Sequence, residues 1–168
     1  MHSIVIMGVA GCGKSSLGTV LSHTIGLPMV EGDDFHSTAN RDKMARGVPL
    51  TDADRDGWLT TLCEQLQSQT QGVVMTCSAL KQAYRTRLRG AAPGLRFVFM
   101  AIGHEQALQR VAARADTHFF STALVYNQFT TLEDPSGEPG VLKVDATAPL
   151  AQLQAEVSHW LLHHNELL

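Results

Sequence analysis

Gly8-Val9-Ala10-Gly11-Cys12-Gly13-Lys14-Ser15, near the start of this 168-residue chain, fits the phosphate-binding pattern G-x-x-x-x-G-K-[ST]. Residues 4–7, directly before it, form an apolar and β-branched run that predicts a buried strand. Apolar residues after it are spaced as one face of a helix: Leu17, Val20, Leu21 and Ile25. A strand, a glycine loop and a helix are the context in which this pattern binds phosphate, because loop N–H groups and the positive helix end share one concavity.

Residues 8–15, here called the phosphate loop, predict a mononucleotide site. We expect Lys14 to reach the β- and γ-phosphates and the Ser15 hydroxyl to ligate Mg²⁺. Beside these two, we expect the nucleotide to contact the rest of the loop and the start of the helix: Gly8, Ala10, Gly11, Cys12, Gly13 and Ser16. The Cys12 thiol lies in the loop beside a helix N-terminus, so we expect its alkylation to inactivate the protein and MgATP to protect it.

The composition argues against several classes of protein. A chain that is 44% hydrophobic and 17% charged is an ordinary globular sequence, and its net charge of −3 argues against a nucleic-acid surface. No run approaches 18 apolar residues, so no membrane span is expected. Three scattered cysteines without metal spacing, and a first strand that leaves no room for a signal peptide, favour a cytoplasmic protein.

The rest of the chain alternates strand and helix patterns. Short apolar runs at 29–30, 73–75, 97–102 and 141–144 predict strands. A capping box at 51–54 opens one of the helices between them, Ser121 caps another and Pro149 begins the last. This alternation predicts a single α/β domain over residues 1–168, with a parallel sheet covered by helices on both faces.

Acidic residues follow the second predicted strand, at the sheet edge where parallel α/β proteins bind ligands. Asp33 is our candidate for the base that orients an acceptor hydroxyl and takes its proton, and Glu31 could hold Mg²⁺ through a water. Alternatively, Asp33 and Asp34 could merely cap the next helix. His36 could donate to a substrate hydroxyl, or it could be a structural histidine.

Basic residues near the same edge favour a substrate that bears a carboxylate. Arg55 begins a helix, where it could bind such a substrate or form a solvated salt bridge. Lys81 follows the third strand closely enough to reach the crevice, and Arg85 lies one helical turn later.

A second cationic segment predicts a lid at about residues 114–121. Arg110, Arg114 and His118 come before Phe119 and Phe120, late in the chain. Such a segment could close over a triphosphate, exclude water and place a cation on the transferring phosphoryl group. An ordinary turn between two helices is the alternative interpretation.

Over about residues 4–145 the chain resembles the gluconate kinases, which are related to shikimate kinase and the nucleoside-monophosphate kinases. Besides the phosphate loop, the resemblance depends on short blocks spread along the chain: G-D-D-F-H at 32–36, Asn40 with Lys43-Met44, G-V-P-L-T-D-A-D-R at 47–55, Trp58-Leu59, C-S-A-L-K at 77–81, Tyr84-Arg85, Leu88-Arg89, His118-Phe119, Gln128-Phe129 and Leu132-Glu133.

The resemblance implies ATP-dependent phosphorylation of D-gluconate at its 6-hydroxyl, giving 6-phosphogluconate and ADP. It also implies a three-layer sandwich like that of the nucleoside-monophosphate kinases, with a five-stranded parallel sheet and a lid, in a protein that is usually a homodimer. Asp33 would take the base position. The residues lining the sugar-acid pocket would be His36, Arg55, Ser78, Lys81 and Arg85.

The chain departs from the family pattern in the lid. The family typically carries R-x-x-H-F, whereas one extra residue and an acid separate Arg114 from His118-Phe119 here. Either Arg110 or Arg114 could therefore be the arginine that reaches the phosphates. The alternatives for function are a kinase for another small hydroxy acid such as shikimate, and a pseudokinase that binds ATP without catalysis. A GTPase switch would need N-K-x-D and D-x-x-G, which the chain lacks.

Overall fold

The computed structural model describes residues 2–114 and 121–164. Their sheet has five parallel strands in the order β2-β3-β1-β4-β5, as predicted. The strands are β1 (Ile4–Met7), β2 (Met29–Glu31), β3 (Val74–Thr76), β4 (Arg96–Ala101) and β5 (Val141–Asp145). Each strand overlaps its predicted apolar run, and the central strand β1 is buried along its whole length because helices cover both of its faces.

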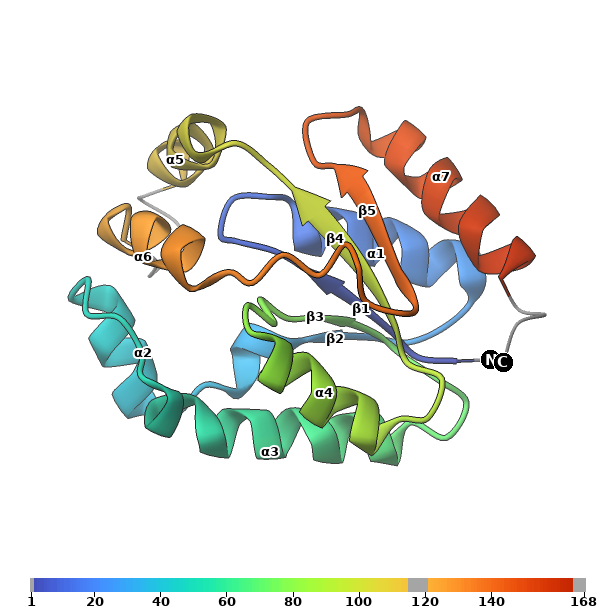
Figure 1. Cartoon of the computed structure of the whole chain (residues 1–168), viewed down its shortest axis with the longest axis horizontal. Coiled ribbons are helices and arrows are strands. Elements are labelled where there is room, and N and C mark those ends of the chain that lie inside the picture. The colour runs from blue at the N-terminus through green and yellow to red at the C-terminus, as the bar shows by residue number, and fades with distance from the viewer. Residues whose placement is uncertain (1, 115–120, 165–168) are drawn as a thin grey trace.

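Helices flank the sheet in two layers (Figure 1). One face is covered by α1 (Lys14–Ile25) and α7 (Leu150–His163), and the other by α3 (Asp52–Ser68) and α4 (Gln82–Ala91). The elements near the carboxyl ends of the strands are the 3₁₀ turn η1 (Gly32–Phe35), α2 (Thr38–Ala45), α5 (His104–Ala113) and α6 (Ala123–Thr131). Among the residues described here, no helix is both long and apolar enough to cross a membrane.

Local sequence signals set where the helices begin. The predicted capping box is present: the Thr51 hydroxyl accepts from the Asp54 N–H at 3.1 Å, and the Asp54 carboxylate accepts from the Thr51 N–H at 2.8 Å. Pro149 lies immediately before α7, as predicted. The Ser121 hydroxyl accepts from the Ala123 N–H at 3.2 Å and so satisfies a donor at the start of α6.

Gly32 sets the course of the chain from β2 into η1. The strands β2 and β3 run side by side with Glu31 opposite Thr76, and the next residue, Gly32, passes close to the β3 backbone. A Cβ atom on Gly32 would lie 2.2 Å from the carbonyl oxygen of Thr76. The indole N–H of Trp58 donates to the Gly32 carbonyl at 2.8 Å. These contacts fix the start of the turn that carries Asp33.

Gly32→Ala should therefore destabilise the protein, because the new methyl group would force η1 away from β3. We expect a loss of about 1–3 kcal/mol in the free energy of unfolding, measured by urea denaturation. Gly57→Ala is the matched control, because Gly57 lies within α3 and a Cβ there meets nothing within 4 Å. This control should be stabilised by up to about 1 kcal/mol. Equal stabilities of the two variants would contradict the close packing of η1 on β3.

Candidate active site

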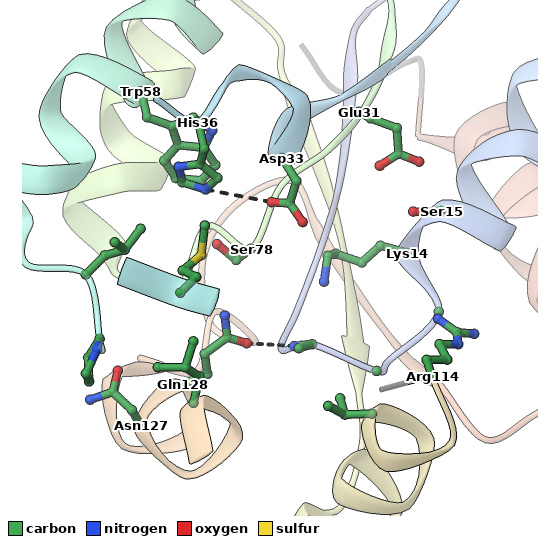
Figure 2. A pocket seen from close by; sticks show the side chains of 18 of the residues that line it. Lys14, Ser15, Glu31, Asp33, His36, Trp58, Ser78, Arg114, Asn127 and Gln128 are labelled. Atoms are coloured by element: carbon green, nitrogen blue, oxygen red, sulfur yellow. Dashed lines mark hydrogen bonds and ion pairs between the residues drawn. The ribbon is translucent and has the colours of Figure 1, made fainter. Parts of the chain in front are cut away.

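A cavity lies at the carboxyl edge of the sheet and joins the phosphate loop to the acidic turn η1 (Figure 2). Side chains from α2, α3, α5 and α6 complete its walls. Most of the predicted site residues line it: Ala10, Gly11, Gly13, Lys14, Ser15, Ser16, Glu31, Asp33, His36, Arg55, Ser78 and Arg114.

The backbone of the phosphate loop takes its shape from its glycines. Gly11 and Gly13 have φ angles of +81° and +95°, in the left-handed region that disfavours other residues. The Lys14 ammonium donates to the carbonyl oxygens of Gly8 and Val9 at 3.0 and 3.1 Å. The lysine is thus held across the loop, with its charge on the cavity side. Gly8 does not line the cavity, but it supports Lys14 through this carbonyl.

Cys12 is placed differently from our expectation. Its side chain is 0% exposed and belongs to the core cluster between the sheet and helices α1 and α7. The Cys12 residue is also absent from the cavity lining. The expected exposure of the Cys12 thiol is therefore not found in this structure, and its alkylation and its protection by MgATP stay predictions.

Asp33 and His36 both line the cavity, with their side chains close to each other. The Asp33 side chain is 57% exposed and points into the cavity between His36 and Lys14 (Figure 2). The His36 ring stacks on Trp58, with centroids 4.3 Å apart and planes 14° from parallel. Its Nε2 atom lies 3.9 Å from the nearer Asp33 carboxylate oxygen. Burial lowers the pKa of His36 to about 4, despite the opposing effect of Asp33. His36 is therefore neutral near pH 7.

Glu31 and Ser15 supply oxygen atoms near the start of α1 (Figure 2). The Thr76 hydroxyl donates to one Glu31 carboxylate oxygen at 2.6 Å and so orients this carboxylate. Within residues 2–114 and 121–164, no group of three or more His, Cys, Asp or Glu residues could hold a metal ion. One carboxylate and one hydroxyl fit Mg²⁺, which takes few protein ligands and keeps waters and substrate phosphates as the others.

Arg55 and Ser78 also line the cavity. Arg55 is buried at the start of α3, and its guanidinium donates to the Tyr84 hydroxyl at 3.4 Å. A cation at this position can receive an anionic group of a ligand bound between α3 and η1.

Two predicted pocket residues do not reach the cavity, because each binds a partner that is distant in sequence. The Lys81 ammonium forms an ion pair with the Asp52 carboxylate at 2.9 Å and does not line the cavity. Arg85 is 0% exposed. Its guanidinium donates to the carbonyl oxygens of Ala79 and Glu133 at 2.8 and 3.0 Å and to the Glu138 carboxylate. Neither residue lines the cavity in this structure, which differs from their prediction as pocket residues.

The two lid arginines have different positions. Arg110 donates to the carbonyl oxygens of Gly11 and Cys12, each at 3.3 Å, and to that of Ala146 at 3.1 Å. It therefore supports the phosphate loop and does not line the cavity, and its nucleotide contact stays a prediction. Arg114 lines the cavity. Residues 115–120 of the predicted lid lie outside the described residues.

Three further polar or aromatic side chains at the cavity were given no role by the sequence: Trp58, Asn127 and Gln128. The Gln128 side-chain oxygen accepts from the Ala10 N–H of the phosphate loop at 2.6 Å (Figure 2). Residue spacing offers no signal for this contact, since 118 positions separate the two residues. The only sequence hint was that Trp58 and Gln128 belong to the blocks shared with the gluconate kinases.

A phosphate loop and an acidic residue in one cavity of a five-stranded parallel sheet define a P-loop kinase for small molecules. A family model described as an AAA domain matches residues 4–134. A gluconokinase from Gluconobacter oxydans (strain 621H) is 40% identical over 144 residues, which are 84% of this chain and 80% of the relative. The crystal structure of a gluconokinase from Sinorhizobium meliloti 1021 matches with a TM-score of 0.85 and 41% identity, over 98% of both chains. The chain belongs to the gluconokinase family.

A more distant likeness concerns the fold alone. Shikimate kinase from Acinetobacter baumannii, solved in complex with shikimate, matches with a TM-score of 0.61 at 16% identity, over 100% of this chain and 96% of that one. The predicted three-layer fold of the P-loop kinases, with its five-stranded parallel sheet, is confirmed.

The neutral state of His36 should make stability depend on pH. The unfolded chain takes up a proton on His36 below about pH 6.5, whereas the folded protein resists this until about pH 4. Stability is therefore fully present above pH 6.5 and falls as the pH drops toward 4. Between pH 7 and pH 5, His36 should contribute a loss of about 2 kcal/mol in the free energy of unfolding.

Urea denaturation of the wild-type protein and of His36→Gln at pH 7 and pH 5 measures this contribution. The other histidines are common to both proteins, so their effects cancel in the comparison. The wild-type protein should lose more stability than the variant over this interval. Parallel losses in the two proteins would show that His36 titrates normally in the folded state.

Proposed function

We propose that this protein transfers the γ-phosphate of ATP to the 6-hydroxyl of D-gluconate, giving 6-phosphogluconate and ADP. Membership of the gluconokinase family supports the reaction. The observation that carries the proposal is a single cavity in which the phosphate loop, Asp33 and the buried cation Arg55 meet. In such a cavity the phosphate loop can bind a nucleotide, Asp33 can bind an acceptor hydroxyl, and Arg55 can bind a carboxylate.

On this proposal, the nucleotide phosphates lie along the phosphate loop. The loop N–H groups and the Lys14 ammonium hold the β- and γ-phosphates, and the lysine gives up its loop carbonyls for phosphate oxygens. Ser15 and Glu31 would hold Mg²⁺, which when bound neutralises part of the phosphate charge. The Thr76 hydroxyl keeps the Glu31 carboxylate turned toward that position.

The sugar acid occupies the other half of the cavity, between η1 and α3. The Arg55 guanidinium binds its carboxylate, and His36 and Ser78 contact its hydroxyl groups. Asp33 orients the reacting hydroxyl toward the γ-phosphorus and accepts its proton as the new P–O bond forms. The bond between the γ-phosphorus and its bridging oxygen breaks, and its electron pair stays on ADP.

The segment 114–121 acts as the lid in this proposal. Arg114 lines the cavity from the end of α5 and would place its charge near the transferring phosphoryl group. Closure of the segment would exclude water, which otherwise competes with gluconate for the phosphoryl group. The homodimer and the cytoplasmic location remain predictions.

Substrate choice tests the proposal directly. Release of ADP from ATP should rise well above its rate without acceptor when D-gluconate is added, and shikimate should give no such rise. Other sugar acids and nucleoside monophosphates complete the panel. Equal stimulation by shikimate and gluconate would rule out the proposed specificity, and ATP binding without turnover on any acceptor would indicate a pseudokinase.

Asp33→Asn tests the mechanism, because it keeps the shape of the side chain and removes its charge and basicity. We expect kcat with gluconate to fall about 10²–10⁴-fold, while the KM for MgATP changes by less than about threefold. Lys14→Ala should lose both nucleotide affinity and turnover, since the ammonium serves the ground state and the transition state.

Asp34→Asn is the matched control for this experiment. Asp34 is the neighbouring carboxylate in η1, but it is exposed and does not line the cavity. This variant should keep near-normal kcat. If Asp33→Asn keeps near-normal kcat and Asp34→Asn does not, the base has been assigned to the wrong carboxylate.

A further inference from the structure

Asn40, in the first turn of α2, is 5% exposed, and its side-chain amide contacts Nδ1 of the His36 ring. Its backbone N–H donates to the Ser37 hydroxyl at 3.1 Å, which fixes the residue at the start of the helix. Its side-chain nitrogen lies 2.8 Å from the carbonyl oxygen of Asp54 and 3.4 Å from Nδ1 of His36. A buried amide thus joins α2, α3 and the histidine that faces Asp33.

These contacts favour one tautomer of His36. A backbone carbonyl oxygen can only accept, so the Asn40 atom beside Asp54 must be the amide nitrogen and not the amide oxygen. That nitrogen carries two hydrogens. One is donated to Asp54, which leaves the other for Nδ1 of His36, 3.4 Å away. This arrangement suits an Nδ1 atom that presents its lone pair, with the single ring proton of the neutral imidazole on Nε2.

The Nε2–H group is directed toward the acceptor half of the cavity. Stacking on Trp58 fixes the ring plane, and the Trp58 indole is itself held by the Gly32 carbonyl. The distance of 3.9 Å from Nε2 to the Asp33 carboxylate is too long for a direct hydrogen bond. It leaves room for a hydroxyl oxygen at about 2.9 Å from each atom. Such a hydroxyl would accept from His36 and donate to Asp33.

Charges near His36 act in both directions. The Asp33 carboxylate favours a protonated ring, whereas Arg55 and Arg41 disfavour it, and burial disfavours it most. The geometry of Asn40 adds a preference that these charges do not supply, because it selects which nitrogen of the neutral ring bears the proton.

We propose that Asn40 is a positioning residue that holds His36 in the Nε2–H tautomer, so that His36 and Asp33 both hydrogen-bond to the acceptor hydroxyl. This inference rests on the proposed function. The hydroxyl oxygen accepts the Nε2–H, directs its own hydrogen to Asp33 and keeps a second lone pair for attack on the γ-phosphorus. Its proton moves to Asp33 as the P–O bond forms, and His36 keeps its proton throughout.

Nitrogen-15 NMR of the imidazole rings, recorded without ligands at pH 7, tests the tautomer independently of any substrate. The His36 signals are assigned by their loss in His36→Gln. In the wild-type protein, Nε2 should be protonated and Nδ1 should not. Asn40→Asp replaces the donor with an acceptor, so the His36 proton should move to Nδ1. Asn40→Ala should give a mixture of the two tautomers.

Steady-state kinetics then test the consequence. Asn40→Asp should lower kcat with gluconate about ten- to hundredfold, because a misdirected donor costs one aligned hydrogen bond. The KM for MgATP should stay within about threefold of the wild-type value. Asn40→Ala should lose less activity than Asn40→Asp. Gln67→Glu makes the same change from amide to carboxylate on an exposed part of α3, and should keep normal activity.

Two results would overturn the inference: a wild-type His36 protonated on Nδ1, or an Asn40→Asp variant that keeps both the Nε2–H signal and normal kcat. If Asn40→Asp does not fold, the wild-type spectrum and Asn40→Ala decide the question. A wild-type protein with the expected tautomer but no activity on gluconate would refute the proposed function and leave the tautomer standing. Gluconate turnover with the opposite tautomer would refute only the role of Asn40.

Discussion

The close approach of the phosphate loop to its neighbours is the constraint on which the rest of the site depends. A Cβ atom on Gly8 would lie 2.9 Å from the carbonyl oxygen of Met100, and one on Gly11 would lie 2.9 Å from that of Ala107. The loop therefore rests directly on the backbone of β4 and α5. This packing turns Cys12 into the core and leaves Lys14 and Ser15 facing the cavity. Any larger residue at these two glycines would move the site as a whole.

The two halves of the cavity are built on different principles. The nucleotide half is made largely of loop backbone groups, with the cations Lys14 and Arg114 beside them, so it depends on the path of the chain. The acceptor half is made of side chains that hold one another: Trp58 stacks on His36 and is anchored to Gly32, the residue before Asp33. Because η1 and α3 share these contacts, the base and the ring opposite it are positioned by the same few residues.

Much of the fold and part of the site could be predicted from the sequence, because the signals are local. The five apolar runs, the capping box at Thr51 and the phosphate loop each lie within a few consecutive residues. Arg85 and Lys81 could not be assigned in this way. Their carboxylate partners are 53 and 29 positions away, and nothing in a helical pattern separates an arginine in a buried ion pair from one that binds substrate. The contact of Gln128 with the loop could not be predicted either, because its partner Ala10 is also distant in sequence.

Arg110 gives the phosphate loop and the end of α5 a common mechanical support. Its guanidinium donates to the carbonyl oxygens of Gly11 and Cys12 in the loop and to that of Ala146, which follows β5. Arg114 lies one helical turn later, at the end of α5. The loop also packs directly on α5, where a Cβ atom on Gly11 would lie 2.9 Å from the carbonyl oxygen of Ala107. Both contacts therefore join the loop to the helix that ends beside Arg114. Through its contacts with the loop carbonyls, Arg110 helps to fix the shape of the loop on which the nucleotide phosphates are proposed to lie.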